Sequence, residues 1–138
     1  MPHRFRSTHQ FLTDLASIDA QHSFLASLDV TALYDHVKIE NFLEILPTVL
    51  EKYACVLNAE HPFYHFSTQE IACICKAIFT SPVISFNGQF YRQKSGVPMG
   101  NPASPTIANL YLSSIEEKIM NGCTSQPLLY TRYLDDIL

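Results

Sequence analysis

The run Leu-Leu-Tyr-Thr-Arg-Tyr-Leu-Asp-Asp, residues 128–136, favours a β-strand and ends in two adjacent acids. A second run, residues 24–30 (FLASLDV), also favours a short strand and carries Asp29 near its end. Ionised acids beside an apolar sheet cost free energy unless they are paired or bind a metal ion. Two such strands lying side by side would bring Asp29, Asp135 and Asp136 together. Aspartate also commonly ends strands and starts turns, so neither run decides the matter alone.

Carboxylates gathered in this way repel one another and therefore favour the binding of cations. Hard divalent ions with oxygen ligands fit best, and Mg²⁺ is the first candidate. The corresponding chemistry is two-metal phosphoryl transfer, in which ions about 3.5–4 Å apart bridge the attacking and leaving oxygens. The sequence thus predicts a shared metal site where two strands end.

Helical spacing of apolar residues appears both before and after the first acidic run. It is weak before residue 24 and clear from Ile39 onward, where Pro47 is expected to kink the helix or split it in two. Residues 67–70, Ser-Thr-Gln-Glu, form a capping box that predicts the start of another helix.

The segment before the second acidic run predicts a hairpin, a loop and a helix. Asn87-Gly88 lies between two β-rich runs, which is a strong hairpin signal. Residues 95–105 contain two glycines and three prolines and predict a constrained loop. The apolar spacing that follows predicts a helix that ends at Gly122.

Strands that alternate with helices, with acids at the strand ends, predict an α+β domain in which one sheet is covered by helices. The 138 residues suit a single domain, and the 47% hydrophobic content allows a packed interior. The formal net charge of −4 argues against a free-standing nucleic-acid-binding module more than against a catalytic core. No apolar run approaches the roughly 18 residues that a membrane span needs.

The cysteines form no C-x-x-C pair, and the N-terminus shows no secretory signal. We therefore expect reduced thiols in an intracellular protein, nuclear or cytoplasmic and not secreted. A zinc site near His61 and His65 is disfavoured, because Pro62 disrupts a helix there and Cys73 and Cys75 point to different helical faces.

Three motifs, in this order, resemble the palm of reverse transcriptases. Residues 27–34 (SLDVTALY) are similar to the first, an aspartate followed five positions later by an aromatic residue. Residues 93–105 (QKSGVPMGNPASP) are similar to the second, a Gly/Pro loop that opens a helix. Residues 133–136 (YLDD) match the third, the Tyr-x-Asp-Asp turn. The residues within and around these motifs most resemble those of Penelope-like retroelements, the telomerase-related branch. Met99 stands where many reverse transcriptases have glutamine, and methionine there is typical of this branch.

The resemblance implies an RNA-directed DNA polymerase that adds dNTPs to a primer 3′-OH on an RNA template, with two Mg²⁺ ions or with Mn²⁺. It implies that Asp29 and Asp135 bind both ions, that the Val30 carbonyl is a further ligand, and that Asp136 supports the pair. Tyr34 would be the steric gate against a 2′-hydroxyl. The further substrate-binding residues that it implies are Gln93, Gly96, Pro98, Met99 and Gly100. Gln93 either contacts the template or caps the loop.

By the same resemblance, residues 1–138 form a partial reverse transcriptase domain that contains palm motifs A, B and C. The fingers cations would precede residue 1, and the second strand of the Asp-Asp hairpin and the thumb would follow Leu138. We therefore expect a palm-type antiparallel sheet that is incomplete at its C-terminus, and no polymerase activity from the chain alone. A non-catalytic remnant of a truncated retroelement is the alternative.

Overall fold

The computed structural model describes residues 7–19, 23–60, 66–80 and 82–138. The chain divides into two compact units, one of Met1–Leu33 with Leu112–Leu138 and the other of Tyr34–Tyr111. The described residues form five helices and five short strands, so the predicted α+β class is confirmed. The predicted single sheet is wrong, because the strands form two separate antiparallel sheets.

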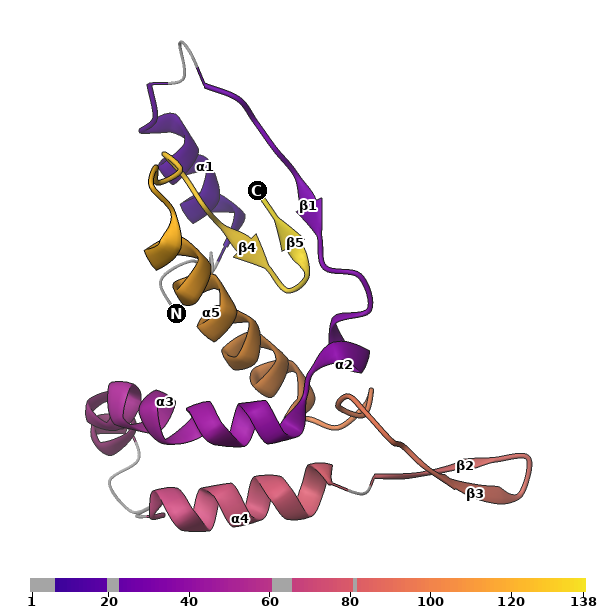
Figure 1. Ribbon diagram of the computed structural model, residues 1–138. Coiled ribbons are helices and arrows are strands. Elements are labelled where there is room, and N and C mark those ends of the chain that lie inside the picture. The colour runs from indigo at the N-terminus through magenta and orange to yellow at the C-terminus, as the bar shows by residue number, and fades with distance from the viewer. Residues whose placement is uncertain (1–6, 20–22, 61–65, 81) are drawn as a thin grey trace. The chain divides into compact units, whose positions relative to one another are not determined.

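The first unit contains the sheet that carries the acids. Strand β1 (Leu28–Asp29) pairs with β5 (Asp136–Ile137), and β5 pairs with β4 (Arg132–Tyr133), in the order β1-β5-β4 (Figure 1). Helix α1 (Thr8–Ala16) begins at Ser7, whose side chain accepts a hydrogen bond from the Gln10 N–H. The C-terminal part of helix α5 (Ser104–Gly122) also belongs to this unit.

The two strands predicted for residues 24–30 and 128–134 are shorter in the structure, where β1 and β4 have two residues each. Residues 24–27 pair with no described strand, and an unpaired run forms no ladder even where its residues favour β structure. The second strand of the Asp-Asp hairpin was expected after Leu138, and this expectation is wrong. Strand β5 already supplies it, and Leu138 exchanges two backbone hydrogen bonds with Thr131, at 2.9 and 3.0 Å.

The second unit is built on two helices that pack against each other, α3 (Ile39–Glu60) and α4 (Thr68–Phe79). Pro47 does not split α3, although a proline within a helix removes one backbone hydrogen bond. Phe42 and Leu46, which precede Pro47 in α3, are buried, and their packing stabilises the helix. The predicted capping box of α4 is confirmed, with Ser67 and Glu70 bonded reciprocally.

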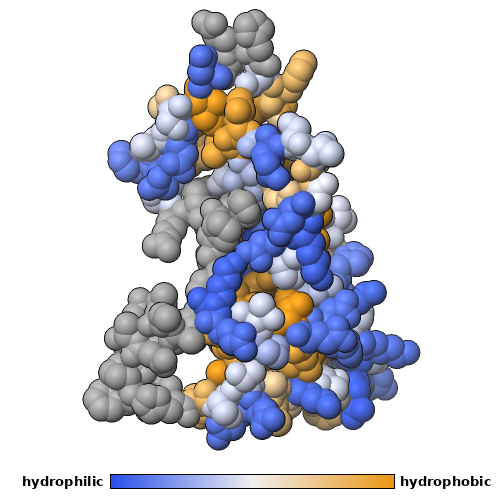
Figure 2. Space-filling model, turned by 60° about the vertical axis from the view of Figure 1, so that its left-hand side comes forward, coloured by the Kyte–Doolittle hydropathy of each residue, from blue (hydrophilic) through white to orange (hydrophobic). Residues whose placement is uncertain are grey.

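The predicted hairpin is also present, as β2 (Val83–Phe86) and β3 (Gln89–Arg92). Asn87 and Gly88 both have positive φ, 51° and 73°, as a two-residue hairpin turn requires. All eight strand residues are exposed, including Phe86 and Phe90. Figure 2 shows hydrophobic residues at the surface among hydrophilic ones.

None of the helices in the described part of the chain has the length and apolar character that a bilayer span requires. The histidines that were considered for zinc, His61 and His65, lie outside the described residues. Within them, Cys73 is exposed and Cys75 is partly buried, and both are free thiols.

Candidate active site

The antiparallel pairing of β1 and β5 places two of the predicted site residues opposite each other. Asp29 lies directly opposite Asp136 in the register, and the Val30 N–H donates to the Asp135 carbonyl oxygen at 3.0 Å. The two strands predicted from the sequence do not lie side by side, because β5, which starts at Asp136, lies between β1 and β4 (Figure 1). Asp29 therefore faces Asp136 across β1 and β5. Strands β1 and β5 pair although they are far apart in the sequence.

The pairing distinguishes the two neighbouring acids. Residues directly opposite each other on antiparallel strands point to the same face, with Cβ atoms about 4.5–5.5 Å apart. Asp136 is thus the cross-strand neighbour of Asp29, whereas Asp135 lies in the two-residue turn that joins β4 to β5. The resemblance to reverse transcriptases implied that Asp135 would share both ions with Asp29 and that Asp136 would support them, and this assignment stays a prediction.

All three aspartates are exposed to solvent, which leaves their oxygens accessible. Among the described residues, no ion pair from Lys, Arg or His to these carboxylates is found. No group of three or more His, Cys, Asp and Glu side chains in the described ranges is close enough to hold a metal ion. The available donors are two opposed carboxylates, a third on the adjoining turn and the Val30 carbonyl, and this all-oxygen set suits Mg²⁺ in chemical type.

Like charges directly opposite each other destabilise an antiparallel pair. We therefore expect Asp29→Asn to raise the free energy of unfolding in metal-free buffer, by about 0.2–1 kcal/mol. The same change should remove the stabilisation that Mg²⁺ gives to the wild-type chain. Urea unfolding with and without Mg²⁺ measures both effects. Glu44→Gln, at an exposed position on α3, is the control for loss of one negative charge. An equal Mg²⁺ response in Asp29→Asn and the wild-type chain would contradict this site.

A buried ion pair lies behind the hairpin turn. Arg132 of β4 is 1% exposed and Glu116 of α5 is 3% exposed. The Arg132 Nε donates to Glu116 Oε1 at 2.5 Å, and Nη2 donates to Glu116 Oε2 at 3.2 Å. Nη2 also donates to Ser113 Oγ at 3.2 Å, and Nη1 donates to the Leu134 carbonyl oxygen at 2.7 Å. Three groups, the Glu116 carboxylate, the Ser113 hydroxyl and the Leu134 carbonyl, thus accept four hydrogen bonds from one guanidinium.

Tyr130 completes this cluster. Its hydroxyl donates to Glu116 Oε1 at 2.8 Å. Burial, and then the hydrogen bond to Glu116, raises the pKa of Tyr130 to about 12. Sequence reasoning missed the cluster, although charged residues within apolar runs, such as Arg132 in the predicted strand, were a visible signal.

The Gly/Pro loop of the second unit packs closely against the segment that carries Tyr34. The Val97 N–H donates to the Tyr34 carbonyl oxygen at 2.8 Å. Gly96 is buried with φ +78°, and a Cβ there would lie 2.5 Å from the Tyr34 carbonyl oxygen and 2.7 Å from the Asp35 Cα. Only glycine combines this backbone angle with this close approach. The sequence predicted a constrained loop here, but it did not predict that the loop packs against the Tyr34 backbone.

The remaining loop residues predicted to bind substrate differ in exposure. Gln93 donates from its amide to the Ser95 carbonyl oxygen at 2.8 Å, which is the loop-capping alternative for this residue. Pro98 is partly buried, and its carbonyl accepts from Ser104 Oγ at 2.6 Å at the start of α5. Met99 is 75% exposed, and Gly100 is exposed with φ +90°. Of the loop residues predicted to bind substrate, Met99 and Gly100 are thus the exposed ones.

A cavity of about 430 Å³ adjoins this loop within the second unit. Its lining includes Lys38 and Lys94 together with Asp35 and Glu40. Because these charges balance, the cavity offers no net attraction for a phosphate group.

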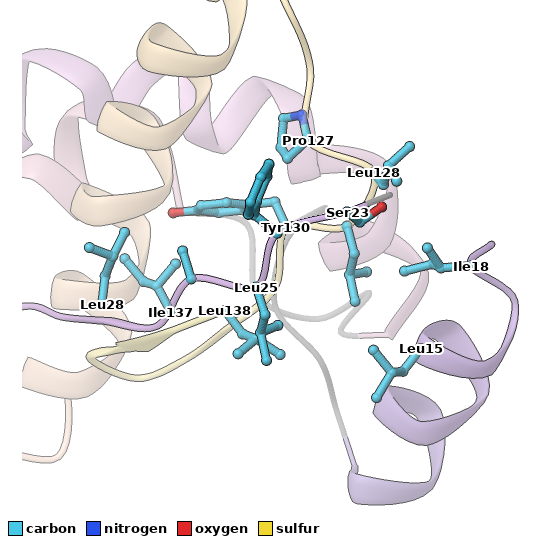
Figure 3. A pocket seen from close by; sticks show the side chains of 13 residues that line it. Leu15, Ile18, Ser23, Leu25, Leu28, Pro127, Leu128, Tyr130, Ile137 and Leu138 are labelled. Carbon is cyan, nitrogen blue, oxygen red and sulfur yellow. The ribbon is translucent and has the colours of Figure 1, made fainter. Parts of the chain in front are cut away.

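The first unit has a larger cavity of about 600 Å³, which is mainly apolar. Figure 3 shows Leu15 of α1 and Ile18, which follows this helix, facing it, with Leu25, Tyr130 and Leu138 among the other lining side chains. None of the three aspartates lines it. The cavity is therefore separate from the proposed metal ligands.

Gly96 provides a sharp stability test of the loop. Gly96→Ala should lower the free energy of unfolding by about 2 kcal/mol or more, because the new Cβ meets backbone atoms and the φ angle is unfavourable for alanine. Gly100→Ala carries the φ cost without a close contact, since nothing lies within 4 Å of its Cβ position. Urea unfolding should therefore rank Gly96→Ala well below Gly100→Ala. Equal losses from the two variants would contradict the close approach to Tyr34.

Carboxylate oxygens on a hairpin turn and on the strand beside it are the type of donor that Mg²⁺ prefers. The chain belongs to the reverse transcriptase (RNA-dependent DNA polymerase) family, whose sequence model matches residues 2–138.

Two curated relatives match part of the chain. It is 43% identical over 44 residues to the retron Ec86 reverse transcriptase of Escherichia coli, which covers 32% of this chain and 14% of that protein. It is 37% identical over 49 residues to the retron Ec83 reverse transcriptase of Escherichia coli, which covers 33% of this chain and 16% of that protein. No solved structure matches the chain closely enough to be counted as similar. These relatives are retron enzymes and do not support the predicted likeness to Penelope-like elements.

Proposed function

We propose that this chain forms the palm of an RNA-directed DNA polymerase, in which Asp29, Asp135 and Asp136 hold two Mg²⁺ ions. The observation that carries the proposal is the pairing of Asp29 with Asp136, with Asp135 in the adjoining turn, in a chain of the reverse transcriptase family. The Val30 carbonyl is the fourth proposed ligand. Mn²⁺ has the same preference for oxygen ligands and is expected to substitute for Mg²⁺.

The proposed reaction joins a dNTP to a primer 3′-OH on an RNA template. Bound Mg²⁺ supplies charge neutralisation and alignment of the attacking and leaving oxygens. The aspartates themselves fix where that positive charge lies. Exposed carboxylates on paired backbone are suited to this part, because the strands hold them in place while their oxygens stay open to substrate.

The loop and Tyr34 are proposed to select the substrate. The exposed tip at Met99 and Gly100 is the part of the loop that nucleotide or template would contact. Gly96 and Pro98 hold the loop through the Tyr34 backbone and Ser104, and Gln93 supports it through Ser95. Tyr34 is partly buried, and its ring is the proposed barrier to a 2′-hydroxyl.

The aligned segments span only 14% and 16% of the two curated relatives. Activity, template, primer and dNTPs are therefore proposed for a full-length parent that carries this chain. The residues of the three motifs favour a Penelope-like retroelement, whereas the curated relatives are retron enzymes. The proposed chemistry is the same for either branch.

Primer extension by the full-length parent tests this proposal directly. On an RNA template with Mg²⁺ or Mn²⁺, the wild-type parent should extend a DNA primer, and Asp29→Ala should abolish extension. Glu44→Gln, which also loses one carboxylate, should extend as the wild type does. The 138-residue chain alone should give no extension. A parent that stays inactive in both metals, or that is unaffected by Asp29→Ala, would refute the assignment and leave the non-catalytic remnant.

The ring of Tyr34 is tested by the choice between dNTPs and rNTPs. Tyr34→Ala should raise ribonucleotide incorporation by the parent, with a change in discrimination of at least about 1–3 kcal/mol. Tyr34→Phe is the matched control, since it keeps the ring and should keep the discrimination. The Tyr34 carbonyl that Val97 uses is unchanged in both variants. Unchanged incorporation ratios in Tyr34→Ala would make this residue an ordinary packing aromatic.

A further inference from the structure

The guanidinium of Arg132 joins helix α5 to the turn that carries Asp135. Three of its partners are oxygens of Glu116 and Ser113 on α5, and the fourth is the Leu134 carbonyl oxygen. All three nitrogens of the guanidinium donate in this arrangement. The planar guanidinium is held in one orientation because it donates to α5 and to the turn at once. A lysine ammonium, which rotates freely, would not be held in this way.

The Leu134 carbonyl belongs to the peptide that links Leu134 to Asp135. A hydrogen bond of 2.7 Å to that oxygen fixes the plane of this peptide, and with it the direction in which the Asp135 side chain leaves the turn. Leu134 has φ +57°, a conformation that a non-glycine residue keeps only when its surroundings hold it there. Arg132 contacts the turn at the residue whose backbone needs such support.

We propose that Arg132 is a positioning residue, anchored by Glu116, that holds the Leu134–Asp135 peptide so that Asp135 is presented to the metal ions. This inference rests on the proposed polymerase function. Arg132 touches neither substrate nor metal in this scheme. It acts only through the turn.

Stability alone is a poor account of this cluster. A buried ion pair pays a large desolvation cost, and replacing it with apolar residues of similar volume is often neutral or stabilising. Removing one partner, by contrast, leaves a buried charge without compensation. Apolar residues in place of the ion pair could fill the same space, but they could not donate a hydrogen bond to the Leu134 carbonyl oxygen. Such a replacement therefore distinguishes a positioning role of Arg132 from a packing role.

The decisive variant replaces the whole cluster by apolar residues: Arg132→Met, Glu116→Leu and Tyr130→Phe together, in the full-length parent. We expect it to fold with a thermal midpoint close to that of the wild type. Its kcat for primer extension should fall about 10- to 100-fold, with little change in the KM for dNTP, because a misdirected ligand affects the chemical step. The Mg²⁺ concentration for half-maximal activity should rise.

Arg132→Lys is the conservative variant, because it keeps the charge and loses the planar fork. It should show the same fall in kcat, and Arg92→Lys, at an exposed position of β3, should show none. Wild-type kcat and Mg²⁺ dependence in a folded triple variant would overturn the inference and leave the cluster a packing element. So would full activity in Arg132→Lys.

Direct metal binding separates this inference from the proposed function. Mn²⁺ titration followed by electron paramagnetic resonance needs no catalysis, and the triple variant should bind Mn²⁺ more weakly than the wild-type parent. If the parent fails to extend primers but this difference is present, the polymerase proposal fails and the positioning role stands. Equal Mn²⁺ affinities in the parent and the triple variant would overturn the positioning role whatever the activity.

Discussion

The proposed active site depends on two carboxylates that face each other across an antiparallel strand pair. The pairing of Asp29 with Asp136 places like charges side by side, which by itself opposes the formation of the sheet. The backbone hydrogen bond from Val30 to Asp135 and the Leu138–Thr131 bonds hold the strands together despite this repulsion. The opposed carboxylates lower the stability of this sheet, but they also place negatively charged oxygens close together, and such oxygens are the ligands that divalent cations prefer.

The support for this arrangement comes from behind the hairpin. Glu116 on α5 and Arg132 on β4 are among the most buried charged residues described, and they compensate each other. Burial of Tyr130 against Glu116 keeps the tyrosine protonated over the ordinary pH range, so it remains a hydrogen-bond donor to the carboxylate. The first unit therefore has three exposed aspartates that form no ion pair with any described residue, and a buried cluster in which Glu116 and Arg132 compensate each other.

Local signals in the sequence predicted local structure well. The Asn87-Gly88 turn and the Ser67–Glu70 capping box depend on a few adjacent residues, and both are present. The sequence also predicted that the two acid-bearing strands would lie side by side, but β5, at the end of the second acidic run, separates β4 from β1. The sequence did not predict the register that places Asp136 opposite Asp29, because register follows from the pairing of whole strands and turn geometry. Nor did it predict Glu116 as the partner of Arg132, since sixteen residues separate them and no periodicity links a helix residue to a strand residue.

The loop of the second unit shows how a backbone contact can join two motifs that are distant in sequence. The Val97 N–H donates to the carbonyl of Tyr34, and the absence of a Cβ at Gly96 allows this close approach. The position of the loop is therefore set by the main chain of the first motif. A substitution at Gly96 displaces the backbone from which the Tyr34 ring projects, whereas a substitution of the ring leaves the loop contact intact. The loop position and the substrate choice proposed for the Tyr34 ring are thus separable by mutation.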